Sequence, residues 1–167
     1  CFRQFCTRGA VLDVGCSSGG FLFNLISRHP DDYSVVGTDV TSAALDYAES
    51  RGIQVIRTSF LDLDLGEPCF DAITFWAVME HLVYPKDFLA KAFSILKPGG
   101  SCFVLVPNMK SLAVRVLGQK YRYIMPDHVN YFTSSTLRAF AQTRSGWEVT
   151  CVKSTHFNPV VLLKDLF

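Results

Sequence analysis

Apolar runs alternate with amphipathic segments from residue 10 to residue 106 of the chain. Short apolar runs are typical of buried strands, whereas apolar residues that recur every three or four positions are typical of helices. The pattern predicts strands over 10–14, 34–40, 53–58, 70–76 and 101–106. Strands that alternate with helices form parallel sheets, so the pattern predicts a doubly wound, mostly parallel α/β fold.

The amphipathic segments predict the helices between these strands. Helices are expected over 21–28, 42–50, 85–96 and 134–143. The face expected to turn inward in the third helix consists of Phe88, Leu89, Ala92, Phe93 and Leu96. Lys97, Pro98, Gly99 and Gly100 then predict a helix stop and a turn. A sixth strand is expected over Trp147–Lys153, and an antiparallel seventh strand over Phe157–Leu163.

Size and composition favour one domain over residues 1–167. A chain of 167 residues with 49% hydrophobic content can build one core and is short for two. The 16 Lys and Arg residues nearly balance the 15 Asp and Glu residues, so no nucleic-acid partner is expected. Six cysteines without a Cys-x-x-Cys pair favour a reducing, cytoplasmic setting. No apolar run reaches the length of a membrane span. The start at Cys1, close to the first strand, is consistent with loss of upstream residues.

Residues 108–132 have no clear place in the sheet. Insertions of this length are usually functional or disordered, and the aromatic residues in this one argue against disorder. Its four basic residues have no acidic neighbour before Pro126, and they are Lys110, Arg115, Lys120 and Arg122. We expect a lid over a small-molecule substrate, and the alternative is a solvated basic face.

A glycine-rich turn follows the first strand. Gly15 and Gly19 permit positive φ or close approach of a ligand, and the next helix begins with unpaired N–H groups. The turn has Ser17 where a dinucleotide-binding motif needs its middle glycine. Asp13, just before the turn, would repel a pyrophosphate and attract an amino group or a cation. Asp39, at the end of the second strand, can accept hydrogen bonds from a ribose diol, which NAD and S-adenosylmethionine both carry.

Five motifs in order reduce these alternatives. They are the turn at 13–19, Asp39, the segment 70–82 that ends in Glu80-His81-Leu82, Leu96–Gly100, and His128–Thr133. With them the chain resembles the class I S-adenosylmethionine-dependent methyltransferases, in particular the small-molecule group that includes the ubiquinone-pathway O-methyltransferases. The resemblance implies the strand order 3-2-1-4-5 for the predicted sheet. It also implies S-adenosyl-L-methionine as the methyl donor and S-adenosyl-L-homocysteine as the product. It also implies methylation of an oxygen, nitrogen or carbon atom of a small molecule.

The resemblance also implies which residues contact the cofactor. Asp13 would lie near the amino group, Asp39 would hold the ribose hydroxyls, and Val40 would form a wall beside the adenine. Ser59 stands where the family has an acid that touches the adenine, and Ser17 stands where it usually has glycine. The full set of expected cofactor contacts is Asp13, Gly15, Cys16, Ser17, Gly19, Asp39, Val40, Ser59, Phe60, Trp76 and Ala77. Trp76 is equally well explained as a large core residue.

Glu80 and His81 are the candidate catalytic residues, because they follow the fourth strand at the edge where open α/β sheets bind ligands. His81 is able to take a proton from a hydroxyl acceptor, and the alternative is that both residues order the loop. For His128 we favour a structural role. No metal site is predicted, because Cys1 and Cys6 lack partners for zinc.

Two other functions remain open. One is an NAD(P)-dependent oxidoreductase, which Ser17 and segment 70–82 oppose. The other is a non-catalytic module that keeps the fold for cofactor binding or assembly. The sequence carries no signal for an oligomeric state.

Overall fold

The computed structural model describes residues 2–143 and 146–154. The chain divides into two compact units. The first comprises Cys1–Val78 and Tyr84–Leu105, and the second comprises Met79–Val83 and Val106–Phe167. Each unit is described by itself below, and the prediction of a single domain stays a prediction.

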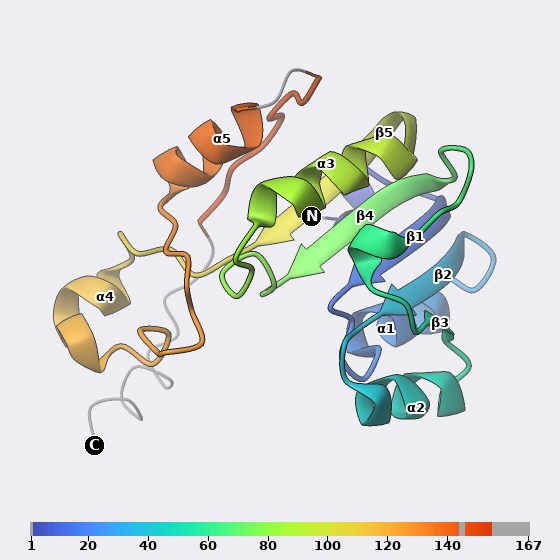
Figure 1. The fold of residues 1–167 in the computed structure, drawn as a ribbon, viewed down its shortest axis with the longest axis horizontal. Coiled ribbons are helices and arrows are strands. Elements are labelled where there is room, and N and C mark those ends of the chain that lie inside the picture. The colour runs from blue at the N-terminus through green and yellow to red at the C-terminus, as the bar shows by residue number, and fades with distance from the viewer. Residues whose placement is uncertain (1, 144–145, 155–167) are drawn as a thin grey trace. The chain divides into compact units, whose positions relative to one another are not determined.

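A five-stranded parallel sheet forms the centre of the first unit (Figure 1). Its strands are β1 (Gly9–Val14), β2 (Tyr33–Thr38), β3 (Gln54–Ile56), β4 (Phe70–Trp76) and β5 (Leu96–Leu105). Their order is β3-β2-β1-β4-β5, with every neighbouring pair parallel. The predicted order 3-2-1-4-5 is confirmed. Parallel order brings the carboxyl ends of the strands to one edge of the sheet, and the residues that follow β1, β2 and β4 meet there.

The central strands carry the core because both of their faces are covered. Val11, Leu12, Ile73 and Phe75 have no exposed surface. One buried cluster joins these strands to α1 (Gly20–Arg28) and α2 (Ser42–Ser50). In Figure 1, α3 (Pro85–Ile95) crosses in front of the sheet. Two short 3-10 helices, η1 (Phe2–Gln4) and η2 (Phe60–Asp62), complete this unit.

Two details of the predicted α3–β5 region were wrong. Phe93 is 43% exposed, and the buried residues of α3 are Leu89, Ala92 and Ile95. The turn predicted at 97–100 lies inside β5, where Phe70 pairs with Leu96 but Ala72 pairs with Ser101. Gly99, with φ of 80°, lies in this irregularity. Pro and Gly end the helix as expected, but the chain rejoins β4 at once and the extra residues form a bulge.

The second unit contains α4 (Leu112–Leu117), η3 (Gly118–Lys120) and α5 (Ser134–Gln142). Thr133 caps α5 in a capping box with Thr136, which explains why the predicted helix begins where it does. The loop 108–132 is closed at its ends, because Asn108 bridges Phe132 and the Met109 amide donates to the Phe132 carbonyl at 2.8 Å. Its role as a lid stays a prediction.

The predicted sixth strand is absent from residues 147–153, which the structure describes without helix or strand. Alternation of apolar and polar residues favours an extended chain, but a strand also needs a hydrogen-bonded neighbour, and this segment belongs to the second unit rather than to the sheet. The predicted seventh strand lies outside the described residues. Among the helices of the described part, none is long and apolar enough to cross a bilayer.

Candidate functional site

The glycine-rich turn after β1 is held in a left-handed backbone conformation. Gly15, Ser17 and Gly19 have φ of 72°, 48° and 71°. The amides of Gly15 and Cys16 donate to the Thr38 carbonyl at 2.8 and 3.0 Å, which ties the turn to the end of β2. Gly19 is the N-cap residue of α1. The turn therefore presents backbone at the carboxyl edge of the sheet, as the sequence predicted.

Two neighbours explain why glycine is needed in this turn. A Cβ added to Gly15 would lie 2.5 Å from Cγ2 of Val78, and a Cβ on Gly19 would lie 3.0 Å from Cβ of Ala48. Val78 was not among the predicted site residues. Its side chain packs directly on the Gly15 backbone, so Val78 and the turn after β1 form one surface within the first unit.

Ser17→Gly is expected to stabilise the fold by about 0.5–1 kcal/mol. A left-handed conformation costs a non-glycine residue about 1–2 kcal/mol, and the greater freedom of glycine in the unfolded chain offsets part of that gain. Urea unfolding measures the difference. Ser18→Gly is the matched control, because Ser18 has no positive φ and the same change there should destabilise. Equal effects at the two serines would contradict this explanation.

Asp39 joins the turn to the start of α2. Its Oδ2 accepts from the Ser17 amide at 2.8 Å, and its Oδ1 accepts from the Thr41 amide at 2.9 Å. The carboxylate is half-buried, so lone pairs remain on the open side of each oxygen. The structure thus brings together the two features that the sequence predicted to face one ligand.

Asp13 lies below the turn and is 2% exposed. Its Oδ1 accepts a 2.5 Å hydrogen bond from the Thr74 hydroxyl. Burial raises its pKa to about 7, the Thr74 hydrogen bond opposes this shift, and the charge of Asp39 adds to it. This carboxyl is therefore poised to change charge near neutrality when a cation approaches.

Cys16 is buried in the turn, and desolvation raises its pKa to about 12. Its thiol is therefore neutral and is not a nucleophile. A Cβ added to Gly37 in β2 would lie 2.6 Å from the Cys16 sulfur. Gly37 makes room for the turn, and an isolated glycine in a predicted strand is the sequence signal for such a close approach.

The residues expected around the adenine differ in their environment. Val40 is 98% exposed and Ser59 is exposed, so both side chains are open to a ligand. Phe60 is 4% exposed and contacts Phe75 edge-to-face and Phe88 in a stacked arrangement. The ring of Phe60 thus belongs to the core, and only the backbone of Phe60 remains for a contact with the adenine.

Trp76 is the last residue of β4, and Ala77 follows it. The Trp76 ring packs edge-to-face on Phe21 with centroids 5.2 Å apart, and its buried Nε1 has no hydrogen-bond partner among the described residues. Ala77 is exposed and has φ of 57°. Trp76 therefore packs in the core and also has an indole N–H without a partner among the described residues. Its two predicted roles, as a core residue and as a cofactor contact, both stay predictions.

The candidate catalytic residues lie in the second unit, with His128. The amides of Val129 and Asn130 donate to the Glu80 carbonyl at 2.9 and 3.0 Å, which holds loop 79–83 against this segment. One ligand atom each of Glu80, His81 and His128 lies within 4.8 Å of the others. Burial raises the pKa of Glu80, and the two histidines oppose the shift. The sequence did not predict this cluster, because the motif that contains His128 lies far along the chain from Glu80.

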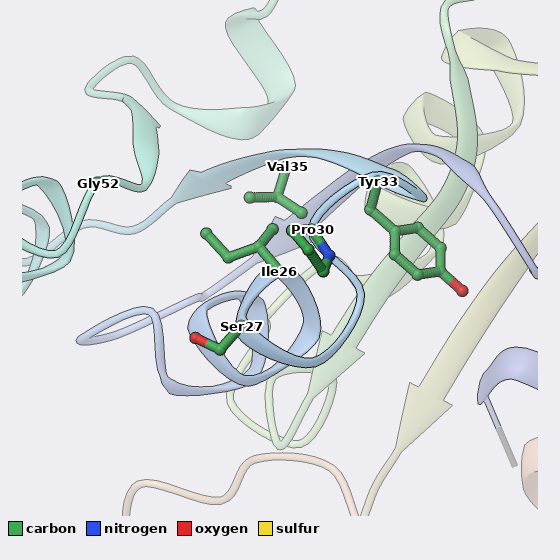
Figure 2. Close-up of a pocket in the computed structure, with 6 residues that line it drawn as sticks. All are labelled: Ile26, Ser27, Pro30, Tyr33, Val35 and Gly52. Atoms are coloured by element: carbon green, nitrogen blue, oxygen red, sulfur yellow. The ribbon is translucent and has the colours of Figure 1, made fainter.

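A pocket of about 460 Å³ lies elsewhere on the first unit (Figure 2). It is lined by Ile26, Ser27, Pro30, Tyr33, Val35 and Gly52. Tyr33 and Val35 come from the first half of β2, away from the end that holds the glycine-rich turn. None of the predicted site residues lines it.

Comparison with known proteins decides the family. A family model described as a methyltransferase domain matches residues 3–152. The chain belongs to this methyltransferase family. The family match, the strand order and the glycine-rich turn after β1 agree with a class I S-adenosylmethionine-dependent methyltransferase. S-adenosylmethionine is the cofactor of this class.

Three similar proteins support the assignment. The methyltransferase chain is 26% identical to a ubiquinone biosynthesis O-methyltransferase of Coxiella burnetii over 90% of its own length and 68% of that protein. A SAM-dependent methyltransferase structure from Archaeoglobus fulgidus has a TM-score of 0.71 and 19% identity, covering 98% of this chain and 78% of that one. The plantazolicin methyltransferase BpumL, solved with SAH, has a TM-score of 0.69 and 17% identity, covering 84% and 57%. At these identities the structural matches show the fold, and none of the three is named as an oxidoreductase.

Proposed function

We propose that this methyltransferase moves the methyl group of S-adenosylmethionine to an oxygen atom of a small molecule. The observation that carries the proposal is the joined cradle of Gly15, Ser17 and Asp39, whose backbone and carboxylate face one edge of the sheet. The choice of oxygen is supported by the printed name of the Coxiella burnetii relative.

Each part of the cradle suits one part of the cofactor. The bare backbone at Gly15 and Gly19 suits the methionine moiety, and Asp13 suits its ammonium group. Asp39 suits the ribose diol, because its carboxylate is already aligned by two backbone amides. Exposed Val40 and Ser59 suit the two sides of the adenine. The cysteines of the described residues are all free, in keeping with the predicted cytoplasmic setting.

The chemistry is an in-line displacement. The acceptor oxygen forms a bond to the methyl carbon, the bond from sulfur to that carbon breaks, and the sulfonium becomes the neutral thioether of S-adenosylhomocysteine. Alignment of the two reactants can supply much of the rate. A hydroxyl acceptor must also lose its proton, and we propose that Glu80 and His81, the candidate catalytic residues of the sequence, assist this step.

Asp39→Ala is expected to weaken binding of S-adenosylhomocysteine at least about 100-fold. Hydrogen bonds to a charged group contribute about 1.5–3 kcal/mol each, and the substitution removes the ribose contacts as well as the alignment of Ser17. Isothermal titration calorimetry measures the affinity. Asp46→Ala on the exposed face of α2 is the matched control and should bind like the wild type. Equal affinities in both variants would show that Asp39 does not hold the ribose.

Product analysis tests the accepting atom. Hydroxyl-bearing small molecules, amines and carbon acids are each incubated with S-adenosylmethionine that carries a labelled methyl group. The proposal predicts label in an ether product. Label on nitrogen or carbon alone would overturn the choice of oxygen and leave the cofactor assignment intact.

A further inference from the structure

Three metal-ligating side chains converge in the second unit. Glu80 is 1% exposed, His128 is 6% exposed, and His81 is exposed beside them. One ligand atom from each lies within 4.8 Å of the other two. Burial of the Glu80 carboxylate costs free energy, because the group loses its hydration and no hydrogen-bond partner among the described residues replaces the water at Oε2.

Two of these side chains each have a buried polar atom without a hydrogen-bond partner among the described residues. Glu80 Oε2 and His128 Nδ1 are buried, and neither has a hydrogen bond to any described residue. The ion pairs found among the described residues join other groups, so neither histidine lies within 4.0 Å of the Glu80 carboxylate. Buried polar atoms are nearly always satisfied in folded proteins. The spacing from the Glu80 carboxylate to either imidazole is therefore too long for a direct hydrogen bond and leaves room for one interposed atom.

The ring of the third group, His81, is held through one of its nitrogens. His81 Nδ1 lies 2.9 Å from the carbonyl oxygen of Asp127. A carbonyl only accepts, so Nδ1 carries the proton and Nε2 of the neutral ring keeps a free lone pair. An imidazole held through one nitrogen by a backbone carbonyl, with the other nitrogen free, is how proteins orient histidine ligands of metals.

We propose that Glu80, His81 and His128 bind one divalent transition-metal ion of the Zn²⁺ class. Two imidazole nitrogens with one carboxylate oxygen suit zinc and its first-row neighbours, whereas Mg²⁺ prefers oxygen ligands alone. Two ligands of one tetrahedral zinc ion lie about 3.4 Å apart, so the side chains would close by roughly 1 Å. The ion satisfies both orphaned atoms at once.

This inference departs from the sequence, which predicted no metal. His128 lies in a separate motif, and no spacing rule connects it to Glu80 and His81. Metal binding does not rest on the proposed function, because it needs no cofactor.

Titration of the untagged, metal-free chain with Co²⁺ tests the site, with visible absorption as the signal. We expect one ion per chain and no thiolate-to-cobalt charge-transfer band, since the proposed ligands contain no sulfur. Zn²⁺ should displace the Co²⁺, and Mg²⁺ in large excess should not. Failure to bind Co²⁺ and Zn²⁺ would overturn the proposal and assign the gap to a bridging water. Displacement by Mg²⁺ would overturn the metal class.

Three variants locate the ion. Glu80→Gln and His128→Gln are each expected to weaken Co²⁺ binding at least about 100-fold, since the loss of an outer-shell partner alone costs 10–100-fold. Circular dichroism tests whether each variant folds. His81→Gln alters an exposed side chain, so it still tests the site if the changes at buried Glu80 or His128 prevent folding. His29→Gln, outside the cluster, is the matched control. Unchanged affinity in the folded cluster variants would overturn the site, while cofactor affinity, measured separately, tests the proposed function.

Discussion

Gly15→Ala is expected to destabilise the folded chain by about 2–5 kcal/mol. The first cause is the left-handed backbone, which costs an alanine about 1–2 kcal/mol at φ of 72°. The second is overpacking, since the new Cβ would lie 2.5 Å from Cγ2 of Val78, and such crowding typically costs about 1–3 kcal/mol. The same substitution is expected to abolish cofactor binding, because relief of the contact with Val78 shifts the backbone of the turn.

A double-mutant cycle separates these two causes. Val78→Ala removes the crowding atom, so Gly15→Ala should cost about 1–2 kcal/mol in that background, which is the backbone contribution alone. Gly20→Ala is the matched control, because Gly20 has no positive φ and no atom within 4 Å of an added Cβ. Chemical denaturation measures all four variants. An equal cost of Gly15→Ala with and without Val78 would show that the contact with Val78 carries no energy.

Asp13→Asn is expected to make the cofactor-free protein more stable at pH 8, by at most about 4 kcal/mol. Burial raises the pKa of Asp13 to about 7 in the folded state, about three pH units above an unfolded aspartate. The folded chain thus holds this proton more tightly than the unfolded chain. The stability contributed by the raised pKa is complete below about pH 4 and is lost as pH rises to about 7. Asparagine keeps the shape and carries no charge at any pH.

The measurement is the free energy of unfolding of both proteins from pH 4 to pH 8. The difference between Asp13→Asn and the wild type should be small at pH 4 and grow until about pH 7. Asp46→Asn, on the exposed surface of α2, is the control and should show no such slope. A difference that does not change with pH would mean that Asp13 stays ionised in the folded protein throughout the range.

Much of the fold could be predicted from the sequence, because the signals are local. The apolar run 70–76 has the bounds of β4, and the helix predicted over 134–143 differs from α5 by one residue. The strand order followed from the resemblance to a known family. In the site, Asp39 and the glycine-rich turn could be paired in advance because parallel strands end at one edge of the sheet.

The remainder depends on contacts between residues distant in sequence. No pattern shows that Val78 packs on Gly15, although the glycine itself signals a close approach. The bulge in β5 depends on how Leu96 and Ser101 pair with β4. The Glu80 and His128 cluster likewise depends on how the loop after β4 meets the end of the insertion. Side-chain neighbours of this kind follow from tertiary packing, and periodicity does not encode them.

The central claim is that the turn after β1 and Asp39 form a site for S-adenosylmethionine. The most direct measurement is isothermal titration calorimetry of the wild-type chain with S-adenosylhomocysteine, with NAD titrated in parallel. The account predicts saturable binding of one S-adenosylhomocysteine per chain and no binding of NAD. Binding of NAD alone, or of neither ligand by a folded protein, would contradict it.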